Sequence, residues 1–260
     1  MPTLEDLLKN YGQIPDLSSF KKPLFVGPHP DDIEFGCGGL VSKFKELGAS
    51  ETYVIATDGG AGTTDPSITP EMMANTRKQE VLDAAAFMGV KNVEFLGLED
   101  GGDYDVTEVI RRLAPVVLKY CPDVIFAPDS HLKTECHADH LKVGEGVRRL
   151  MQIAPHPESL RRHHVNVDGF SEFPGNMTLA LFFTDDANAK VEISEKNFGE
   201  KMQSLMLHKS QMQSSETELL MMYFKMKAEK LGQGTDTGLA EDYQVILPIM
   251  QHVYSEGIHL

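Results

Sequence analysis

The sequence contains no tryptophan, and only three of its 260 residues are cysteines. Three scattered cysteines cannot form a fully paired disulfide framework, which excludes a disulfide-stabilised module and predicts a reducing, cytoplasmic location. No apolar run is long enough to span a bilayer, and residues 1–20 lack the basic start and apolar centre of a signal peptide. We therefore expect a globular cytoplasmic protein.

Basic side chains are also few. The chain has 24 Lys and Arg against 39 Asp and Glu, which gives a net charge of −15. A field of this sign repels phosphate backbones and anionic lipid. Nucleic acid and membrane surfaces are therefore not expected as partners, whereas a small neutral ligand is compatible with the charge.

What is present fits one elaborated α/β domain. With 41% hydrophobic residues, 260 residues can bury one substantial core, so we expect a single domain over 1–260, with its core at about 20–190 and a C-terminal extension at about 191–260. Alternating patterns predict a Rossmann-like three-layer sandwich with a mostly parallel sheet and a helical extension. The expected strands are 24–28, 52–57, 92–96, 123–127 and 178–183, and the expected helices are 37–47, 71–88, 106–119 and 138–151.

The first candidate site follows a short apolar run at residues 22–26. The segment Gly27-Pro28-His29-Pro30-Asp31-Asp32 lies directly after this expected strand. Ligands bind outside the carboxyl ends of strands in open α/β sheets. An Asp-rich turn could instead simply cap the next helix, but that role leaves His29 and the second carboxylate unexplained.

A second cluster, His137-Ala138-Asp139-His140, follows the expected strand Pro122–Pro128 and a polar loop. Both clusters should open on the same edge of the sheet. Two histidines and an aspartate suit a divalent metal and leave one coordination position for water, which is typical of a catalytic site. A separate thiolate site at Cys136 and His140 is an alternative, although no second Cys/His pair completes it.

On these residues the sequence resembles the zinc-dependent N-acetylglucosaminyl de-N-acetylases, the PIG-L or LmbE-like family. Further family-like segments are Thr57-Asp58-Gly59-Gly60, Arg77-Lys78-Gln79-Glu80, Leu96-Gly97-Leu98-Glu99-Asp100 and His208-Lys209-Ser210-Gln211. Two more, Thr63-Thr64-Asp65 and Ala240-Glu241-Asp242-Tyr243, favour the diacetylchitobiose deacetylase branch. The resemblance implies removal of an N-acetyl group from a small amino sugar.

Carried over, the resemblance implies that His29, Asp32 and His140 hold Zn²⁺ and that Asp31 is the general base. His137, oriented by Asp139, is the candidate donor to the oxyanion, and either His137 or Asp31 would protonate the departing amine. Ala138 departs from the family, in which a proline is common, and this could loosen the loop. Two nitrogens and one carboxylate could also hold iron, cobalt or nickel.

Substrate contacts are expected from Arg77, Asp58 and Asp100. For Arg77 a solvated cation on a helix is equally compatible with the sequence, and an ordinary turn role is favoured for Asp103. The segment 208–211 is expected to anchor a helix end against the site loops. The segment Ala154–Gly175 is expected to be a long surface loop, either a lid or simply solvated.

Assembly and substrate remain open at this point. The resembling branch suggests a homo-oligomer, a trimer or hexamer, in which the C-terminal tail could bring His252 into a neighbour's active site as a second oxyanion donor. The substrate could instead be a thiol-cyclitol conjugate of N-acetylglucosamine or another N-acyl compound. A non-catalytic nucleotide- or sugar-binding module is a further alternative, but the glycines at 36–39 lack the third glycine of the dinucleotide fingerprint.

Overall fold

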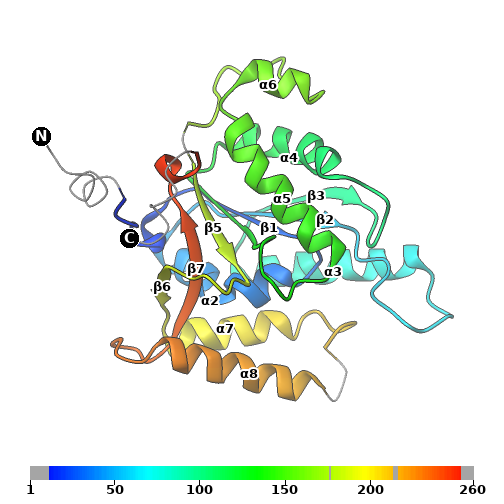
Figure 1. Ribbon diagram of the computed structural model, residues 1–260. Helices are drawn as coiled ribbons and strands as arrows, with labels where there is room; N and C mark the ends of the chain where they lie inside the picture. Colours follow the sequence, from blue (N-terminus) through cyan, green and yellow to red (C-terminus); the bar gives the residue numbers. More distant parts are fainter. Residues whose placement is uncertain (1–11, 176, 213–215, 253–260) are drawn as a thin grey trace, which may run out of the picture.

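A seven-stranded sheet forms the centre of the protein, whose computed structural model describes residues 12–175, 177–212 and 216–252 (Figure 1). The strands lie in the order β3-β2-β1-β4-β5-β7-β6. Their bounds are β1 (Pro23–Gly27), β2 (Thr52–Thr57), β3 (Asn92–Leu98), β4 (Val124–Pro128), β5 (Thr178–Phe182), β6 (Ala189–Glu192) and β7 (Ala240–Ile246).

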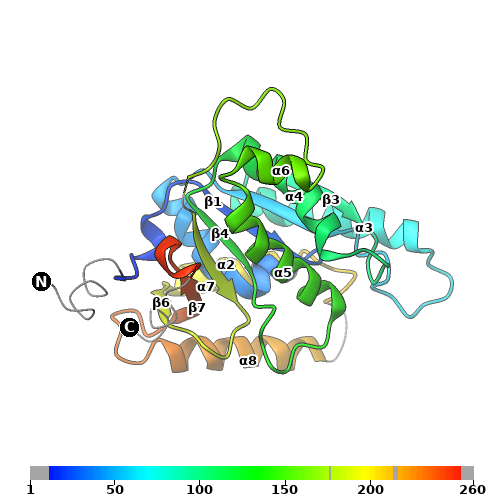
Figure 2. The ribbon, with the colours of Figure 1, turned by 45° about the horizontal axis from the view of Figure 1, so that its top comes forward.

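Helices connect most of these strands. Their bounds are α2 (Asp32–Leu47), α3 (Pro70–Met88), α4 (Val106–Tyr120), α5 (Ala138–Ile153), α6 (Pro157–Arg162), α7 (Glu195–Leu205) and α8 (Glu216–Leu231), with short 3-10 turns η1 (Leu17–Ser19) and η2 (Pro248–Met250). Helices α4 and α5 cover one face of the sheet, and α2, α3 and α7 the other, with α8 outside α7 (Figures 1 and 2). None of the helices in the described part of the chain is long and apolar enough to cross a membrane.

Strands β1 to β5 are parallel, and the chain reverses its direction of travel across the sheet at β1. The connections from β1 lead outward through β2 to β3, and the next connection returns to β4 on the other side of β1. In an open parallel sheet, the crevice outside the carboxyl ends of strands at such a switch point is the usual ligand site. The fold thus directs attention to the segments that follow β1 and β4.

The predicted fold class is confirmed, with differences in detail. Helix α2 begins at Asp32 rather than at residue 37, so its three glycines lie inside the helix. A Cβ at Gly36 would lie 2.4 Å from the Phe182 ring, and one at Gly39 would lie 2.6 Å from Ile193. The glycines therefore serve close packing of α2. The dinucleotide-binding alternative loses its support, because its phosphate loop would have to precede the helix.

Two further segments differ from the expectation. The expected loop Ala154–Gly175 contains the short helix α6. The C-terminal extension has the expected helices α7 and α8 but also contributes β7, which pairs antiparallel with β5 and β6. The apolar run that includes Val245 and Ile246 is consequently buried in the chain's own sheet rather than free for a neighbour. The division of the chain into domains stays a prediction.

Candidate active site

The segments after β1 and β4 meet at the switch point. The turn Pro28–Asp31 leads from β1 into α2, and His137 caps the amino end of α5. His29, Asp32 and His140 each offer one ligand atom, all within 4.8 Å of one another, and all three are largely shielded from solvent. The predicted pairing of the two motifs is therefore present in the structure.

Asp32 is the centre of this group. Its Oδ2 accepts a hydrogen bond from the backbone N–H of His29 at 2.7 Å. The same oxygen lies 3.2 Å from His29 Nδ1 and 3.4 Å from His140 Nε2. Burial raises the pKa of Asp32, but the two imidazoles outweigh it, and the net pKa is well below its usual range. The carboxylate is thus ionised and faces two nitrogen donors.

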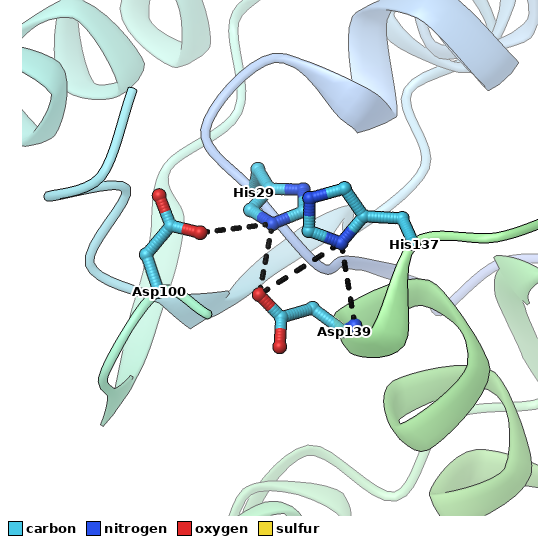
Figure 3. A group of neighbouring side chains, drawn as sticks. All are labelled: His29, Asp100, His137 and Asp139. Carbon is cyan, nitrogen blue, oxygen red and sulfur yellow. Dashed lines mark hydrogen bonds and ion pairs between the residues drawn. The ribbon is translucent and has the colours of Figure 1, made fainter. Parts of the chain in front are cut away.

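His29 is surrounded by carboxylates. Its Nε2 lies 3.1 Å from Asp139 Oδ2 and 3.3 Å from Asp100 Oδ1, as Figure 3 shows. Burial lowers the pKa of His29, but the hydrogen bonds to Asp100, Asp139 and Asp32 outweigh this and raise the pKa to about 11. This concentration of negative charge favours a cation at the group, whether a proton or a metal ion.

Asp139 is placed differently from the expectation. It was predicted to orient His137, but its carboxylate lies 4.0 Å from His137 Nδ1 and contacts His29 more closely. The other Asp139 oxygen accepts from the Tyr104 hydroxyl at 2.7 Å, and the Gly101 N–H donates to Oδ2 at 2.9 Å. These contacts hold the pKa of Asp139 well below its usual range despite its burial. Asp139 therefore fixes the His29 ring.

His137 lies beside His29, with ring centroids 4.4 Å apart. Its Nδ1 accepts a hydrogen bond from the Asp139 backbone N–H at 3.3 Å. Burial, together with the neighbouring His29 and His140 rings, lowers the pKa of His137. The ring is then neutral at neutral pH, and because Nδ1 is the acceptor, the proton lies on Nε2. His137 thus offers an N–H donor at the site.

Asp31 adopts a backbone φ of 119°, in the left-handed region that only a few non-glycine residues enter. Such strain is concentrated at active sites. Burial raises the pKa of Asp31. The Arg77 guanidinium opposes this rise and the neighbouring Asp32 carboxylate adds to it, and the net pKa of Asp31 is about 7. Asp31 and Asp32 are adjacent, yet their pKa values are shifted in opposite directions.

The Arg77 side chain reaches the site and is not a solvated cation on the surface of its helix. Its side chain is buried, and Nη2 donates to the Pro30 carbonyl at 2.6 Å and to Asp31 Oδ2 at 3.2 Å. Nη1 donates to the Gly59 carbonyl at 3.3 Å. The guanidinium thus binds the expected base rather than lying free in solvent.

Asp100 and Asp58, the other predicted substrate residues, accept hydrogen bonds from the backbone of the loops around the site. Asp100 Oδ2 accepts from the Ala61 N–H at 3.1 Å while its other oxygen faces His29. Asp58 Oδ1 accepts from the N–H groups of Gly60 and Asp100. These bonds tie the loops after β2 and β3 together. An open pocket lies between them, lined by Asp31, Ala61, Gly62, Arg77, Asp100 and His137 together with His29.

Two predicted residues are not part of this group. Cys136 is exposed, and no cluster of potential metal ligands in the described part of the chain contains a cysteine, so the thiolate alternative is not supported. His252 is exposed and follows η2, near the amino end of β5, where the Gln251 side chain donates to the Met177 carbonyl. This is the opposite end of the sheet from His29 within one chain.

Sequence reasoning missed several supporting residues. Glu135 Oε2 lies 3.1 Å from His140 Nδ1, and its other oxygen accepts from the His137 N–H at 2.7 Å. A carboxylate behind a metal-type histidine is a common support. Tyr104 was also missed. The only sequence signal for Glu135 was its position two residues before His137. No spacing in the sequence indicates Tyr104.

The segment 208–211 anchors the site as expected. Ser210 donates through its N–H and its hydroxyl to the Glu80 carboxylate on α3, each at 2.7 Å. Gln211 Nε2 donates to the Gly62 carbonyl at 3.0 Å. His208 is fully buried, with Nε2 3.6 Å from Glu34 Oε2. The end of α7 is thereby joined to α2, to α3 and to the loop that forms the pocket.

The chain therefore combines an open α/β sheet with a His-Asp-His group at its switch point, and this combination is typical of α/β proteins that bind a divalent metal. Residues 24–151 match the model of the PIG-L family, described as GlcNAc-PI de-N-acetylase, and the chain carries a PIG-L family domain. This confirms the resemblance seen in the sequence.

Relatives with named activities match most of the chain. A diacetylchitobiose deacetylase of Thermococcus kodakarensis is 28% identical over 241 residues, which cover 90% of this chain and 86% of the relative. A probable N-acetyl-alpha-D-glucosaminyl L-malate deacetylase 2 of Bacillus cereus is 28% identical over 195 residues, covering 72% and 82%. The structure of N,N′-diacetylchitobiose deacetylase from Pyrococcus horikoshii superposes with a TM-score of 0.87 at 26% identity, covering 97% of this chain and 96% of that one.

Proposed function

We propose that this protein is a zinc-dependent hydrolase that removes the N-acetyl group from a sugar containing N-acetylglucosamine, such as diacetylchitobiose. The observation that carries the proposal is the pair of adjacent aspartates at the switch point. Asp32 lies between the His29 and His140 imidazoles as a ligand would, whereas the neighbouring Asp31 carboxylate is bonded to Arg77 and lines the pocket, where a general base is required. The diacetylchitobiose deacetylases that match nearly the whole chain support this substrate class.

The donor set fits a divalent metal. Two imidazole nitrogens and one carboxylate oxygen converge from the β1–α2 turn and from α5, and Glu135 and Asp139 contact the two imidazoles. We assign His29, Asp32 and His140 as the ligands of zinc. Zinc with three protein ligands lowers the pKa of a bound water towards about 7 and so supplies the nucleophile.

Asp31 is assigned as the general base. It accepts a proton from the attacking water as the water oxygen bonds to the acetyl carbon, and it returns a proton to the nitrogen as the carbon–nitrogen bond breaks. Acetate and the free amine are the products. Arg77 holds the Asp31 carboxylate in place and limits how far burial raises its pKa. Arg77 therefore positions the base, and it can also contact the sugar from the pocket wall.

His137 is assigned as the donor to the oxyanion. The neutral ring carries its proton on Nε2, since Nδ1 accepts from the Asp139 N–H. A donor already oriented before reaction stabilises the developing charge without reorganisation. Asp139 and Asp100 support the neighbouring His29 ring, and we assign Asp100 and Asp58 to the loops that shape the sugar pocket.

The wider assignments are also proposals. A thiol-cyclitol conjugate or a different N-acyl compound is not favoured as the substrate, because the relatives that match nearly the whole chain are diacetylchitobiose deacetylases. We propose a cytoplasmic trimer or hexamer in which a neighbour supplies His252, because His252 is exposed and far from its own chain's site. Full turnover by His252→Ala in an intact oligomer would remove this residue from the mechanism.

The decisive experiment measures amine release from N-acetylglucosamine and N,N′-diacetylchitobiose by protein that is stripped of metal and reloaded with zinc. We expect zinc-dependent release that falls by roughly 10²–10⁴-fold in Asp31→Asn. The matched control is Asp103→Asn, an exposed aspartate of the β3–α4 loop, which should keep the wild-type rate. Stoichiometric zinc binding without release from either sugar would contradict the proposed substrate class.

A further inference from the structure

A second, apolar space begins beside Asp31, on the side of the site that faces α8. This groove is lined by Asp31, Phe35, Gln211, Met212, Leu219, Leu220 and Tyr223, together with Thr217, and it has a volume of about 750 Å³. Pockets that hold small molecules range over roughly 300–1,000 Å³. The groove is therefore large enough for a ligand, and Asp31 belongs both to it and to the polar pocket of the active site.

The walls of the groove come mainly from aromatic and aliphatic side chains. The Phe35 ring stacks on Phe224 at 5.4 Å between centroids, and Tyr223 packs edge-on against the same Phe224 ring. Leu219 and Tyr223 are 63% and 56% exposed. Apolar surface of this kind beside a polar site is typical of a surface that binds a ligand.

Gln211 joins the two spaces. Its side chain lines the groove, and its Nε2 donates to the carbonyl of Gly62, which lines the polar pocket. The pocket on the Gly62 side has charged and polar side chains in its wall, among them Arg77, Asp100 and His137. The two spaces thus meet at Asp31 with opposite chemistry: one suits hydroxyl groups and the other suits hydrocarbon.

We propose that the groove binds the N-acyl chain of the substrate, so that the enzyme hydrolyses N-acylglucosamines with chains of several carbons as well as the N-acetyl compound. This inference rests on the proposed function. The amide carbon beside Asp31 carries two substituents, the sugar nitrogen and the acyl chain. The sugar hydroxyls require the polar pocket, and the acyl chain is left facing the groove, most of which a single methyl group would not fill.

The reaction is the same hydrolysis with a longer product acid. The oxygen of water bonds to the acyl carbon, the carbon–nitrogen bond breaks, and the nitrogen receives the proton that Asp31 accepted. A carboxylate of the same chain length and free glucosamine are released. No oxidant or further reactant is needed.

The test compares kcat/KM for N-hexanoylglucosamine and N-acetylglucosamine in the zinc-loaded protein. Burial of part of the added hydrocarbon should raise the ratio of hexanoyl to acetyl kcat/KM to roughly tenfold. In Leu219→Asn/Tyr223→Asn this ratio should fall towards one. The matched control, Met222→Asn/Met226→Asn, alters two residues of the same helix that are 54% and 61% exposed and do not line the groove, and it should keep the wild-type ratio.

The other outcomes each overturn a different statement. Hydrolysis of the acetyl compound with no preference for hexanoyl would overturn the groove assignment and leave the proposed function intact. If neither compound is hydrolysed, the proposed function fails, and calorimetric binding of both compounds to zinc-loaded Asp31→Asn tests the groove alone. Equal affinities for the two compounds in that measurement would overturn the inference.

A second copy of the chain is the competing occupant of this surface. Sedimentation of the same variants distinguishes it. If Leu219→Asn/Tyr223→Asn changes the oligomer mass and the wild-type protein shows no preference for the hexanoyl compound, the groove is a contact between copies, and the inference is wrong.

Discussion

The parallel part of the sheet, β1 to β5, and the C-terminal part from β6 to β7 differ in how completely their buried charged groups are paired. At the carboxyl edge of the parallel strands, several carboxylates surround one imidazole, and the pKa of His29 rises to about 11. In the C-terminal part, buried Lys201 donates to Glu241 at 2.6 Å. Glu241 also accepts from the Tyr243 hydroxyl and from the N–H groups of Gly39 and Leu40. The negative charges around His29, at the candidate active site, are therefore not fully balanced. The charges of Lys201 and Glu241, which support the fold, are fully paired.

Removal of one carboxylate from the uncompensated cluster should have the largest effect. In Asp32→Ala we expect bound zinc to fall below one equivalent and kcat/KM to fall by at least about 10³-fold, because two imidazoles alone are a poor ligand set. Metal analysis and amine release measure both quantities. Asp103→Ala is the control and should retain metal and turnover. Full zinc content in Asp32→Ala would contradict the assignment.

Breaking the paired cluster should change stability rather than chemistry. Lys201→Met leaves Glu241 buried without its cation, which costs about 3–5 kcal/mol of the free energy of unfolding. Urea denaturation measures the loss. The double variant Lys201→Met/Glu241→Gln should recover part of it, because no unpaired charge remains. A loss below about 1 kcal/mol would show that the pair is not buried as described.

Asp139→Asn removes one negative charge at the carboxyl edge of the parallel strands. The amide keeps the size of the side chain but lacks the charge that holds the His29 ring, so we expect a 10–100-fold loss of zinc affinity or turnover. Tyr104→Phe is the milder partner variant, since it removes only the hydroxyl donor to Asp139. Competition with a chelator measures zinc affinity. Equal losses in the two variants would argue against a special role for the Asp139 charge.

The smallest effect concerns Glu51, at the amino end of β2, whose Oε2 is buried without a partner. Burial raises its pKa from 4.5 to about 8, although Lys45 opposes the shift. The folded state then holds a proton that the unfolded state loses above pH 4.5. Stability falls as the pH rises from about 4.5 to about 8 and levels off above. Glu51→Gln should therefore stabilise the protein more at pH 8 than at pH 4, where Glu51 is protonated in both the folded and the unfolded state.

Thermal unfolding of Glu51→Gln and the wild type across this pH range tests the sign. A benefit that decreases between pH 5 and pH 8 would contradict the raised pKa of Glu51. The residue lies at the opposite end of β2 from the active site, so turnover should be unchanged.

Much of the active edge could be predicted from sequence because the signals there are local. Short apolar runs end directly at His29, Asp31 and Asp32, and parallel strands must bring such ends to one edge. The boundaries of α2 were less accessible, because glycines at 36–39 disfavour a helix by propensity, and only packing against Phe182 and Ile193 explains them. The roles of the individual site residues stay predictions.

Contacts between distant single residues could not be predicted. Tyr104 contacts Asp139, and Glu34 lies beside His208, without any spacing in the sequence that indicates either pair. Asp139 was expected from the family resemblance to orient His137, but the fold brings its carboxylate closer to His29. Strand β7 was missed for the same reason: its Glu241 pairs with Lys201 on α7 and accepts from the N–H groups of α2, and its Asp242 lies 2.8 Å from Lys227 on α8.

The position of β7 has a consequence for how the chain folds. Glu241 is bonded to Gly39, 202 residues earlier, and β7 separates β5 from β6 in the sheet. During synthesis helix α2 is complete long before its carboxylate partner Glu241 exists, and β6 has no edge to join until β7 is made. Closure of such long-range contacts is slow. Strand β7 therefore completes the sheet late in synthesis, and until then the unpaired edge of β5 is open to other chains.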